Sequence, residues 1–228
     1  MTADDWVGAV KAALLPLARP ADAEPMAGYM KHVAPFLGIR APDRRRAVLA
    51  SIKNLPPPSQ ERLHDIVLTL WAEPEREYQY AACDVLTRFA PLLSEEFLAD
   101  PTERLLKAKP WWDTVDFLGS AVVSPLTARY PAALDLMWQW CRSGDRWLIR
   151  ASIQHQRGRR ERTDMEVLTS MSALHAADSE FFVSKAIGWA MRDTSRWFPS
   201  EVRAFIDDHP DLSPVARREA ERGLARVG

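Results

Sequence analysis

The spacing of apolar residues limits this chain to one class of fold. Apolar side chains recur three and four positions apart, for example at Met26, Tyr29, Met30, Val33 and Phe36 and again at Leu63, Ile66, Val67 and Leu70. This spacing places them on one face of an α-helix, and no segment shows the alternation of apolar and polar residues that marks a half-buried β-strand. The sequence therefore predicts an all-α fold in which each helix buries one apolar stripe.

Prolines divide this helical pattern into short segments. Several of the 17 prolines stand where a helix would begin. Proline is well tolerated there, because the N–H group that it lacks would have no partner within the first turn of the helix. We expect about a dozen short helices of roughly ten to seventeen residues each. One of them is expected to carry Pro110 in its first turn.

Such a series of short helices has two ways to bury its apolar faces. The helices can stack in pairs of roughly 35 to 45 residues, the period of HEAT-like repeats, which leaves a concave surface for a long ligand. They can instead close into a helical bundle. Length and periodicity fit both arrangements, and in either one we expect residues 1–228 to form a single domain.

No segment of the sequence resembles a membrane span, a secretion signal or a metal site. The apolar runs stay well short of the roughly 18 residues of a membrane helix, and Asp4 and Asp5 stand where a secretion signal would carry basic residues. Cys83 and Cys141 are far apart, and no histidines are paired at the spacing of metal ligands. We therefore expect a cytoplasmic protein without metal, cofactor or disulfide.

The formal net charge of −1 hides a strong asymmetry along the chain. Seven arginines and only two acidic residues lie between Arg142 and Arg162, and Arg44, Arg45 and Arg46 form a second basic cluster. The segment from Glu61 to Glu77 is acidic instead. One surface could therefore bind phosphate groups, although solvated helix faces would produce the same counts.

Three tryptophans lie three or four residues from a charged residue, which places each pair on one helix face. The pairs are Trp112 with Asp116, Trp147 with Arg150, and Trp189 with Lys185 and Arg192. Tryptophans also anchor helical cores, so each pair alone fits a structural role. The sequence lacks a nucleophile elbow, a glycine-rich phosphate loop and an HExxH motif. Aromatic faces beside a carboxylate instead suit a reaction that develops positive charge.

Six segments, in order, resemble the AlkD family of bacterial DNA glycosylases. They are Ala23–Lys31, Phe36–Ile39, Pro42–Arg45, Pro74–Glu77, Trp111–Asp116 and Phe181–Trp189. The family is built from HEAT-like repeats whose concave, basic face holds duplex DNA, so the resemblance favours the solenoid over the bundle. Its members excise cationic N3- and N7-alkylated purines, and they leave the lesion stacked in the duplex.

The resemblance also assigns roles to individual residues. Asp116 matches the catalytic carboxylate, and Trp112 and Trp189 match the aromatic walls beside the sugar of the lesion. Arg150 matches a residue that grips the nearby backbone, and Tyr29 and Lys31 fall where the family lines the DNA cleft. To these we add further basic residues expected to face phosphates because of their charge and spacing, namely Arg44, Arg45, Arg146, Lys185 and Arg192.

The sequence departs from the family pattern in two places. The run from Gln154 to Arg162 is polar and basic where an apolar helix is expected, which suggests a loop that contacts DNA, and we assign no role to His155 within it. Arg40 and Ala41 replace small polar groups that are expected to face the DNA. Both changes concern substrate preference and leave the predicted catalytic residues unchanged.

We predict a monomeric glycosylase that needs no metal. It is expected to be monofunctional, because no lysine occupies the position of Asp116 to form a Schiff base and cleave the strand. Two other functions fit the same sequence. A non-catalytic relative would use the cleft to bind distorted or branched DNA and would tolerate the loss of Asp116. A HEAT-type scaffold would bind a protein and would show no salt-dependent affinity for DNA.

Overall fold

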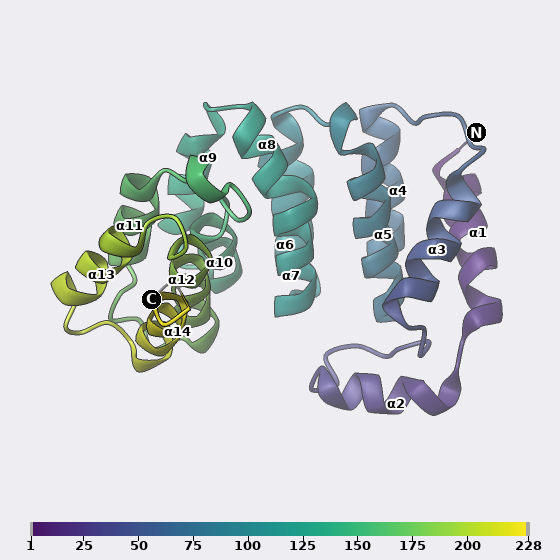
Figure 1. Ribbon diagram of the computed structural model, residues 1–228. Helices are drawn as coiled ribbons and strands as arrows, with labels where there is room; N and C mark the ends of the chain where they lie inside the picture. The colour runs from purple at the N-terminus through teal and green to yellow at the C-terminus, as the bar shows by residue number, and fades with distance from the viewer. Residues whose placement is uncertain (1, 227–228) are drawn as a thin grey trace. The chain divides into compact units, whose positions relative to one another are not determined.

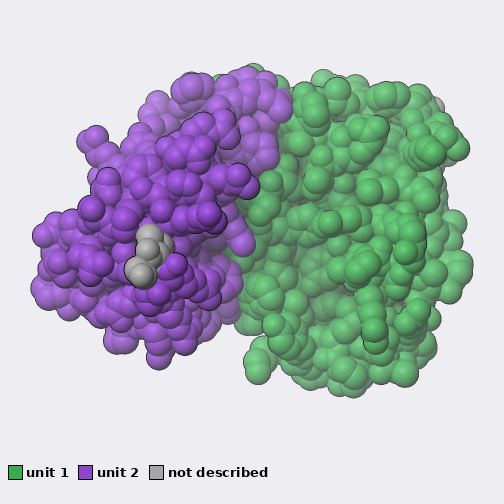
Figure 2. Space-filling model, viewed as in Figure 1, with its two compact units in different colours: residues 1–122 green, residues 123–228 purple. Residues whose placement is uncertain are grey.

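The computed structural model describes residues 2–226, and within them every regular element is a helix (Figure 1). The all-α prediction is therefore confirmed. The chain divides into two compact units, which we call unit 1 (residues 1–122) and unit 2 (residues 123–228; Figure 2). That residues 1–228 form a single domain stays a prediction.

The helices of unit 1 pack around a shared apolar core. Its helices are α1 (Ala3–Leu14), α2 (Pro20–Tyr29), α3 (Ala41–Ile52), α4 (Gln60–Ala72), α5 (Arg76–Phe89), α6 (Glu103–Lys107) and α7 (Trp112–Leu118). Helix α1 packs against α3 and α4, and α5 packs against α3, α4 and α7. Leu63, Ile66, Val67 and Leu70 of α4 are completely buried. Because they are three or four residues apart, they lie on the one face of the helix that packs against the core.

Helix α2 runs across the direction of α4 and α5 (Figure 1). A small cluster of Ala27, Met30 and Phe36 ties it to the rest of unit 1. The chain leaves this cluster through Gly38, whose φ of +81° favours glycine. A Cβ at this position would lie 2.1 Å from the carbonyl oxygen of Arg19, so no side chain fits.

The buried carboxylate of Glu77, at the start of α5, fixes the segment that follows this cluster. It accepts hydrogen bonds from the backbone N–H groups of Leu37 (2.9 Å), Gly38 (2.9 Å) and Ile39 (3.0 Å). These three donors would otherwise be unpaired inside the unit. Glu77 therefore holds the segment between α2 and α3 against the start of α5.

Unit 2 is built around α12. Its helices are α8 (Ser124–Arg129), α9 (Ala133–Cys141), α10 (Arg146–Ile153), α11 (Met165–Ala173), α12 (Phe181–Thr194), α13 (Pro199–Asp208) and α14 (Pro214–Leu224). Helix α12 packs against α10 and, most extensively, against α14. Gly188 allows this close approach, since a Cβ there would lie 2.7 Å from the Cβ of Glu219.

Two sequence predictions about helices are wrong in detail. Several helices are shorter than expected, since α6 has 5 residues and α7 has 7. Pro110 does not lie in the first turn of α7, because that helix begins at Trp112 with Trp111 as its N-cap. The chain instead makes a left-handed turn at Lys109 (φ 49°) before the helix starts.

No helix within residues 2–226 is long and apolar enough to cross a membrane. The predicted cytoplasmic location stays a prediction. Among the same residues, no group of histidine, cysteine, aspartate or glutamate side chains converges as metal ligands.

Candidate functional site

Trp112 and Asp116 lie one helical turn apart in α7, so their side chains share one face of this helix. Both side chains are half-buried. The aromatic surface and the carboxylate that the sequence singled out therefore come from a single rigid element of unit 1.

A buried ion pair fixes the start of α7. The Arg76 guanidinium, 1% exposed, donates to both carboxylate oxygens of Asp113, at 2.6 and 3.1 Å. It also donates to the Thr114 hydroxyl (2.9 Å) and to the Lys109 carbonyl (2.8 Å). Removing one member of such a buried pair costs about 3 to 5 kcal/mol, because the other charge is left without a partner. The pair therefore fixes the position from which α7 presents Asp116.

Tyr80 completes this network from the middle of α5. Its hydroxyl donates to the Asp113 carboxylate. Burial raises the pKa of Tyr80 strongly, and the negative charge of Asp113 raises it further. The phenol therefore stays protonated and remains a donor at any physiological pH. Arg76, Tyr80 and Asp113 were not predicted as part of the site, although Arg76 and Asp113 lie in the matched segments Pro74–Glu77 and Trp111–Asp116.

Trp112 meets a second aromatic side chain from α2. The rings of Trp112 and Tyr29 make an edge-on contact, with centroids 6.4 Å apart and planes at 80°. Tyr29 is 73% exposed, while Trp112 also packs on the cluster of Ala27, Met30 and Phe36. The pair thus presents an aromatic surface that is anchored on one side and open to solvent on the other.

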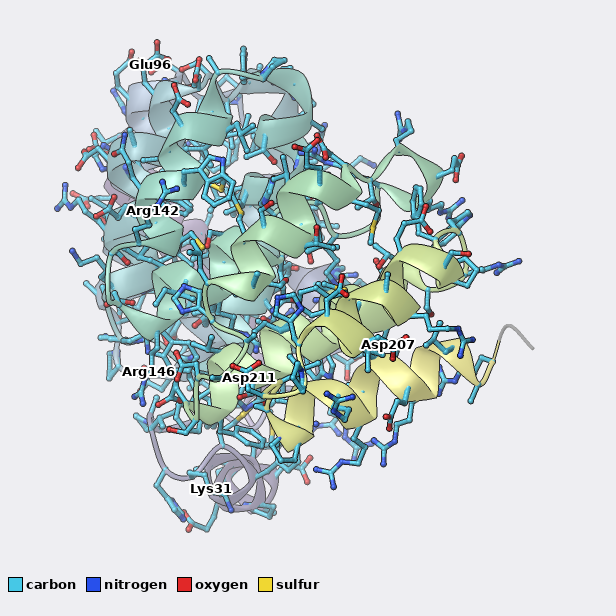
Figure 3. All side chains as sticks on the ribbon, turned by 90° about the vertical axis from the view of Figure 1, so that its left-hand side faces the viewer. Lys31, Glu96, Arg142, Arg146, Asp207 and Asp211 are labelled. Atoms are coloured by element: carbon cyan, nitrogen blue, oxygen red, sulfur yellow. The ribbon has the colours of Figure 1, made fainter. Side chains whose placement is uncertain are left out.

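The other basic residues predicted in unit 1 have different environments. Lys31 is exposed in the left-handed turn that follows α2 (φ 61°; Figure 3). Arg44 is 4% exposed and donates to Asp84 at 2.9 Å, which favours a structural role for it. Arg45 also pairs with Asp84, at 3.2 Å, but its side chain is 61% exposed. Contact of Lys31 and Arg45 with phosphate groups stays a prediction.

In unit 2 the half-buried Trp189 ring lies among three cations. The guanidinium of Arg150 lies 5.1 Å from its centroid, that of Arg192 lies 5.7 Å away, and the ammonium group of Lys185 lies 6.0 Å away. Such contacts are worth roughly 0.5 to 2 kcal/mol each. They hold the indole in one orientation on α12.

A buried carboxylate on α14 positions two of these cations. Glu219, 3% exposed at its side chain, accepts from Lys185 at 2.9 Å, from Arg192 at 2.5 Å and from Arg222 at 3.0 Å. Burial acts to raise the pKa of Glu219, but the hydrogen bond from Lys185 and the nearby positive charges outweigh it and lower the pKa. The carboxylate therefore stays ionised and keeps the cations in place beside Trp189.

Helix α10 supplies the remaining predicted residues. Arg150 is 1% exposed and donates to the carbonyl oxygen of Phe182 at 2.8 Å, so its guanidinium links α10 to α12. Arg146 (labelled in Figure 3) is half-exposed. It pairs with Glu180 at 3.4 Å and covers the ring of Trp147 at 5.1 Å. Of the two arginines, only Arg146 presents its charge at the surface.

The polar run after α10 is more buried than the sequence suggested. Gln154, His155 and Gln156 are at most 8% exposed, and only the part from Arg157 to Arg162 reaches the surface. The Nδ1–H group of His155 donates to the Ser152 carbonyl at 2.6 Å. Burial lowers the pKa of His155 to about 4. The expectation that this whole segment forms a surface loop is therefore wrong for its first three residues.

Comparisons with known proteins point in one direction. A family model described as DNA alkylation repair enzyme matches residues 10–224. A solved structure described as a predicted DNA alkylation repair enzyme from Enterococcus faecalis is similar, with a TM-score of 0.81 and 29% sequence identity over 92% of this chain and 97% of its own. No protein of curated function matches the chain in sequence.

Proposed function

Since the chain belongs to the family of DNA alkylation repair enzymes, we propose that it is a DNA glycosylase for cationic N3- and N7-alkylated purines in duplex DNA. Its membership places it in the repair of alkylated DNA, with DNA as its substrate. The observation that carries the glycosylase proposal is that Asp116 and Trp112 lie on one face of α7. This helix is fixed by the buried ion pair of Arg76 and Asp113.

The chemistry follows from the charge of the lesion. A purine alkylated at N3 or N7 is already cationic, so it leaves with the bonding electrons and needs neither a proton nor a metal ion. As the bond from C1′ to the purine nitrogen breaks, positive charge develops on the sugar. The Asp116 carboxylate stabilises this oxocarbenium ion and orients the water that attacks C1′. Because the nucleophile is water and not a lysine, no Schiff base forms and the strand stays intact.

The aromatic residues stabilise the same positive charge. Trp112 and, from unit 2, Trp189 lie against the deoxyribose in this proposal and contribute weak attraction to the developing cation, of roughly 0.5 to 2 kcal/mol each. Tyr29, edge-on to Trp112, extends this aromatic surface toward the DNA. That the enzyme works as a monomer stays a prediction.

The proposal is tested by single-turnover release of 7-methylguanine from a defined duplex. Asp116→Asn is expected to lower the rate at least about a hundredfold, because it removes the charge and keeps the shape. Asp135→Asn, an equal charge change at an exposed position of α9, is the matched control and should leave the rate unchanged. Salt-sensitive duplex binding without release of 7-methylguanine by the wild type would contradict this substrate, and would favour either a bulkier alkylated purine or a non-catalytic DNA-binding protein.

A further inference from the structure

A cavity of about 820 Å³ lies within unit 2, beside Trp189. It is bounded by the end of α10 and the segment after it, by the second half of α12, and by the end of α14. Two indoles, Trp189 and Trp197, contribute to its wall. Four arginines also line it, namely Arg157, Arg192, Arg196 and Arg226.

Three of these four cations have no carboxylate to neutralise them. Arg192 is paired with Glu219, as described above. Arg157, Arg196 and Arg226 are exposed, and in residues 2–226 none of them forms an ion pair. Asp193 also lines the cavity and accepts from the backbone N–H group of Gly158; its single negative charge offsets only one of the four arginines. Like charges gathered around one hollow repel each other, and a bound anion would relieve this repulsion.

A buried amide in the same wall also lacks a partner. The side chain of Gln154 lines the cavity and is 8% exposed. Its Nε2 is buried and has no hydrogen-bond acceptor among the described residues. Buried donors are nearly always paired, so each unpaired one points to a group that the isolated chain does not supply. An oxygen atom of a bound anion would be such an acceptor.

We propose that this cavity binds the phosphate group of a nucleotide, an inference that rests on the proposed function. Guanidinium groups bind phosphate oxygens through paired donors, and indole faces contact sugars and bases. Trp189 belongs both to this cavity and to the residues that the family resemblance places beside the lesion. A phosphate of the DNA strand near the lesion is thus the favoured occupant. The unusual run after α10 then has a role, because it supplies both Gln154 and Arg157.

The experiment compares a cavity variant with a variant of equal charge. The cavity variant is Arg157→Ala, Arg196→Ala and Arg226→Ala together, and the control is Arg142→Ala, Arg203→Ala and Arg218→Ala, three exposed arginines of unit 2 outside the cavity. Affinity for a short undamaged duplex is measured from about 50 to 200 mM salt, where each phosphate contact adds about 0.9 to the slope of log affinity against log salt. Thermal unfolding checks that both variants fold.

If the cavity holds DNA phosphates, the cavity variant should lose up to about 2.7 from this slope, and clearly more than the control loses. Calorimetric titration with deoxyguanosine 5′-monophosphate separates the other source of the same chemistry. In one outcome, the wild type binds the mononucleotide and only the cavity variant loses this binding. If the two variants then have equal slopes of duplex affinity against salt, the occupant is a free nucleotide. Equal slopes for both variants, together with no such loss of mononucleotide binding, would overturn the proposal.

This test is independent of base release. Because the duplex is undamaged, a failure of the glycosylase proposal would leave the slopes readable. Conversely, the cavity variant can leave the slope and the mononucleotide binding unchanged while the wild type releases 7-methylguanine normally. This outcome would reject phosphate binding by the cavity and would support the glycosylase proposal.

Discussion

At the scale of single residues, Asp113 shows how one carboxylate can support a site without taking part in its chemistry. Its replacement by alanine leaves Arg76 charged and buried, and we expect the free energy of unfolding to fall by about 3 to 5 kcal/mol. Urea denaturation measures this loss. The double variant Arg76→Met, Asp113→Leu should recover much of it, since no buried charge remains. Equal losses in the single and double variants would contradict this account of the pair.

His155 makes the stability of the protein depend on pH. Burial holds its pKa at about 4 in the folded chain, below the ordinary value of 6.5. The unfolded chain therefore takes up a proton below pH 6.5 while the folded chain does not, so stability is full above this pH and falls as the pH approaches 4. The loss amounts to about 3 kcal/mol.

The measurement for His155 is the free energy of unfolding at several pH values. His155→Asn should remove most of the loss between pH 6.5 and 4, whereas His32→Asn, at an exposed position, should keep it. If the free energy of unfolding of the wild type stays constant between pH 6.5 and 4, the folded and unfolded chains take up protons equally, so His155 is protonated in the folded chain as well.

Partners of single charged residues were the part of the site that the sequence could not predict. Helical spacing correctly placed Trp112 and Asp116 on one face, because that relation is local. The partners of Arg44 and Asp113, and two of the three partners of Glu219, are far away along the chain, and only the packing of helices brings them together. Charge and spacing along the chain therefore predicted a phosphate contact for Arg44, although its charge is already neutralised by Asp84 inside the unit.

At the scale of elements, the contact between α12 and α14 depends on the absence of a side chain at Gly188. Gly188→Ala would place a methyl group 2.7 Å from the Cβ of Glu219 and 2.9 Å from the carbonyl oxygen of Ala216. We expect a destabilisation of about 1 to 3 kcal/mol, since the helices must move apart. Gly8→Ala in α1 is the matched control, because nothing lies within 4 Å of its new methyl group. The control should stabilise the protein by about 0.5 to 1 kcal/mol. Thermal unfolding of both variants tests whether only Gly188→Ala destabilises the protein.

The existence and type of the helices were predictable, and their ends were not. The apolar period alone identified α4, whose four apolar residues are all buried. The start of α7 escaped prediction because it is set by distant groups. Lys109 donates its ammonium hydrogens to the carbonyl oxygens of Ala72 and Glu73, and Arg76 binds the carbonyl oxygen of Lys109. These contacts fix the left-handed turn before the helix, which moves Pro110 out of its first turn.

At the scale of the whole molecule, the proposed function draws on both units. Trp112 belongs to unit 1 and Trp189 to unit 2, and the family resemblance assigns both to one lesion. If both indoles stabilise the same oxocarbenium ion, replacing either by alanine should lower the rate of 7-methylguanine release by about 2- to 30-fold, which corresponds to roughly 0.5 to 2 kcal/mol of lost attraction.

The double variant shows whether the two tryptophans act on one sugar. Residues that contact the same group are coupled, so the cost of the double variant should differ from the sum of the single costs by about 0.5 kcal/mol or more. Single-turnover rates for the wild type, Trp112→Ala, Trp189→Ala and the double variant form the cycle. Trp138→Ala paired with Trp112→Ala provides the comparison, since Trp138 on α9 has no proposed part in catalysis and should act additively. Additive effects of Trp112 and Trp189 as well would mean that the two tryptophans do not act on one transition state. The catalytic role would then rest on Asp116 and the residues around it in unit 1.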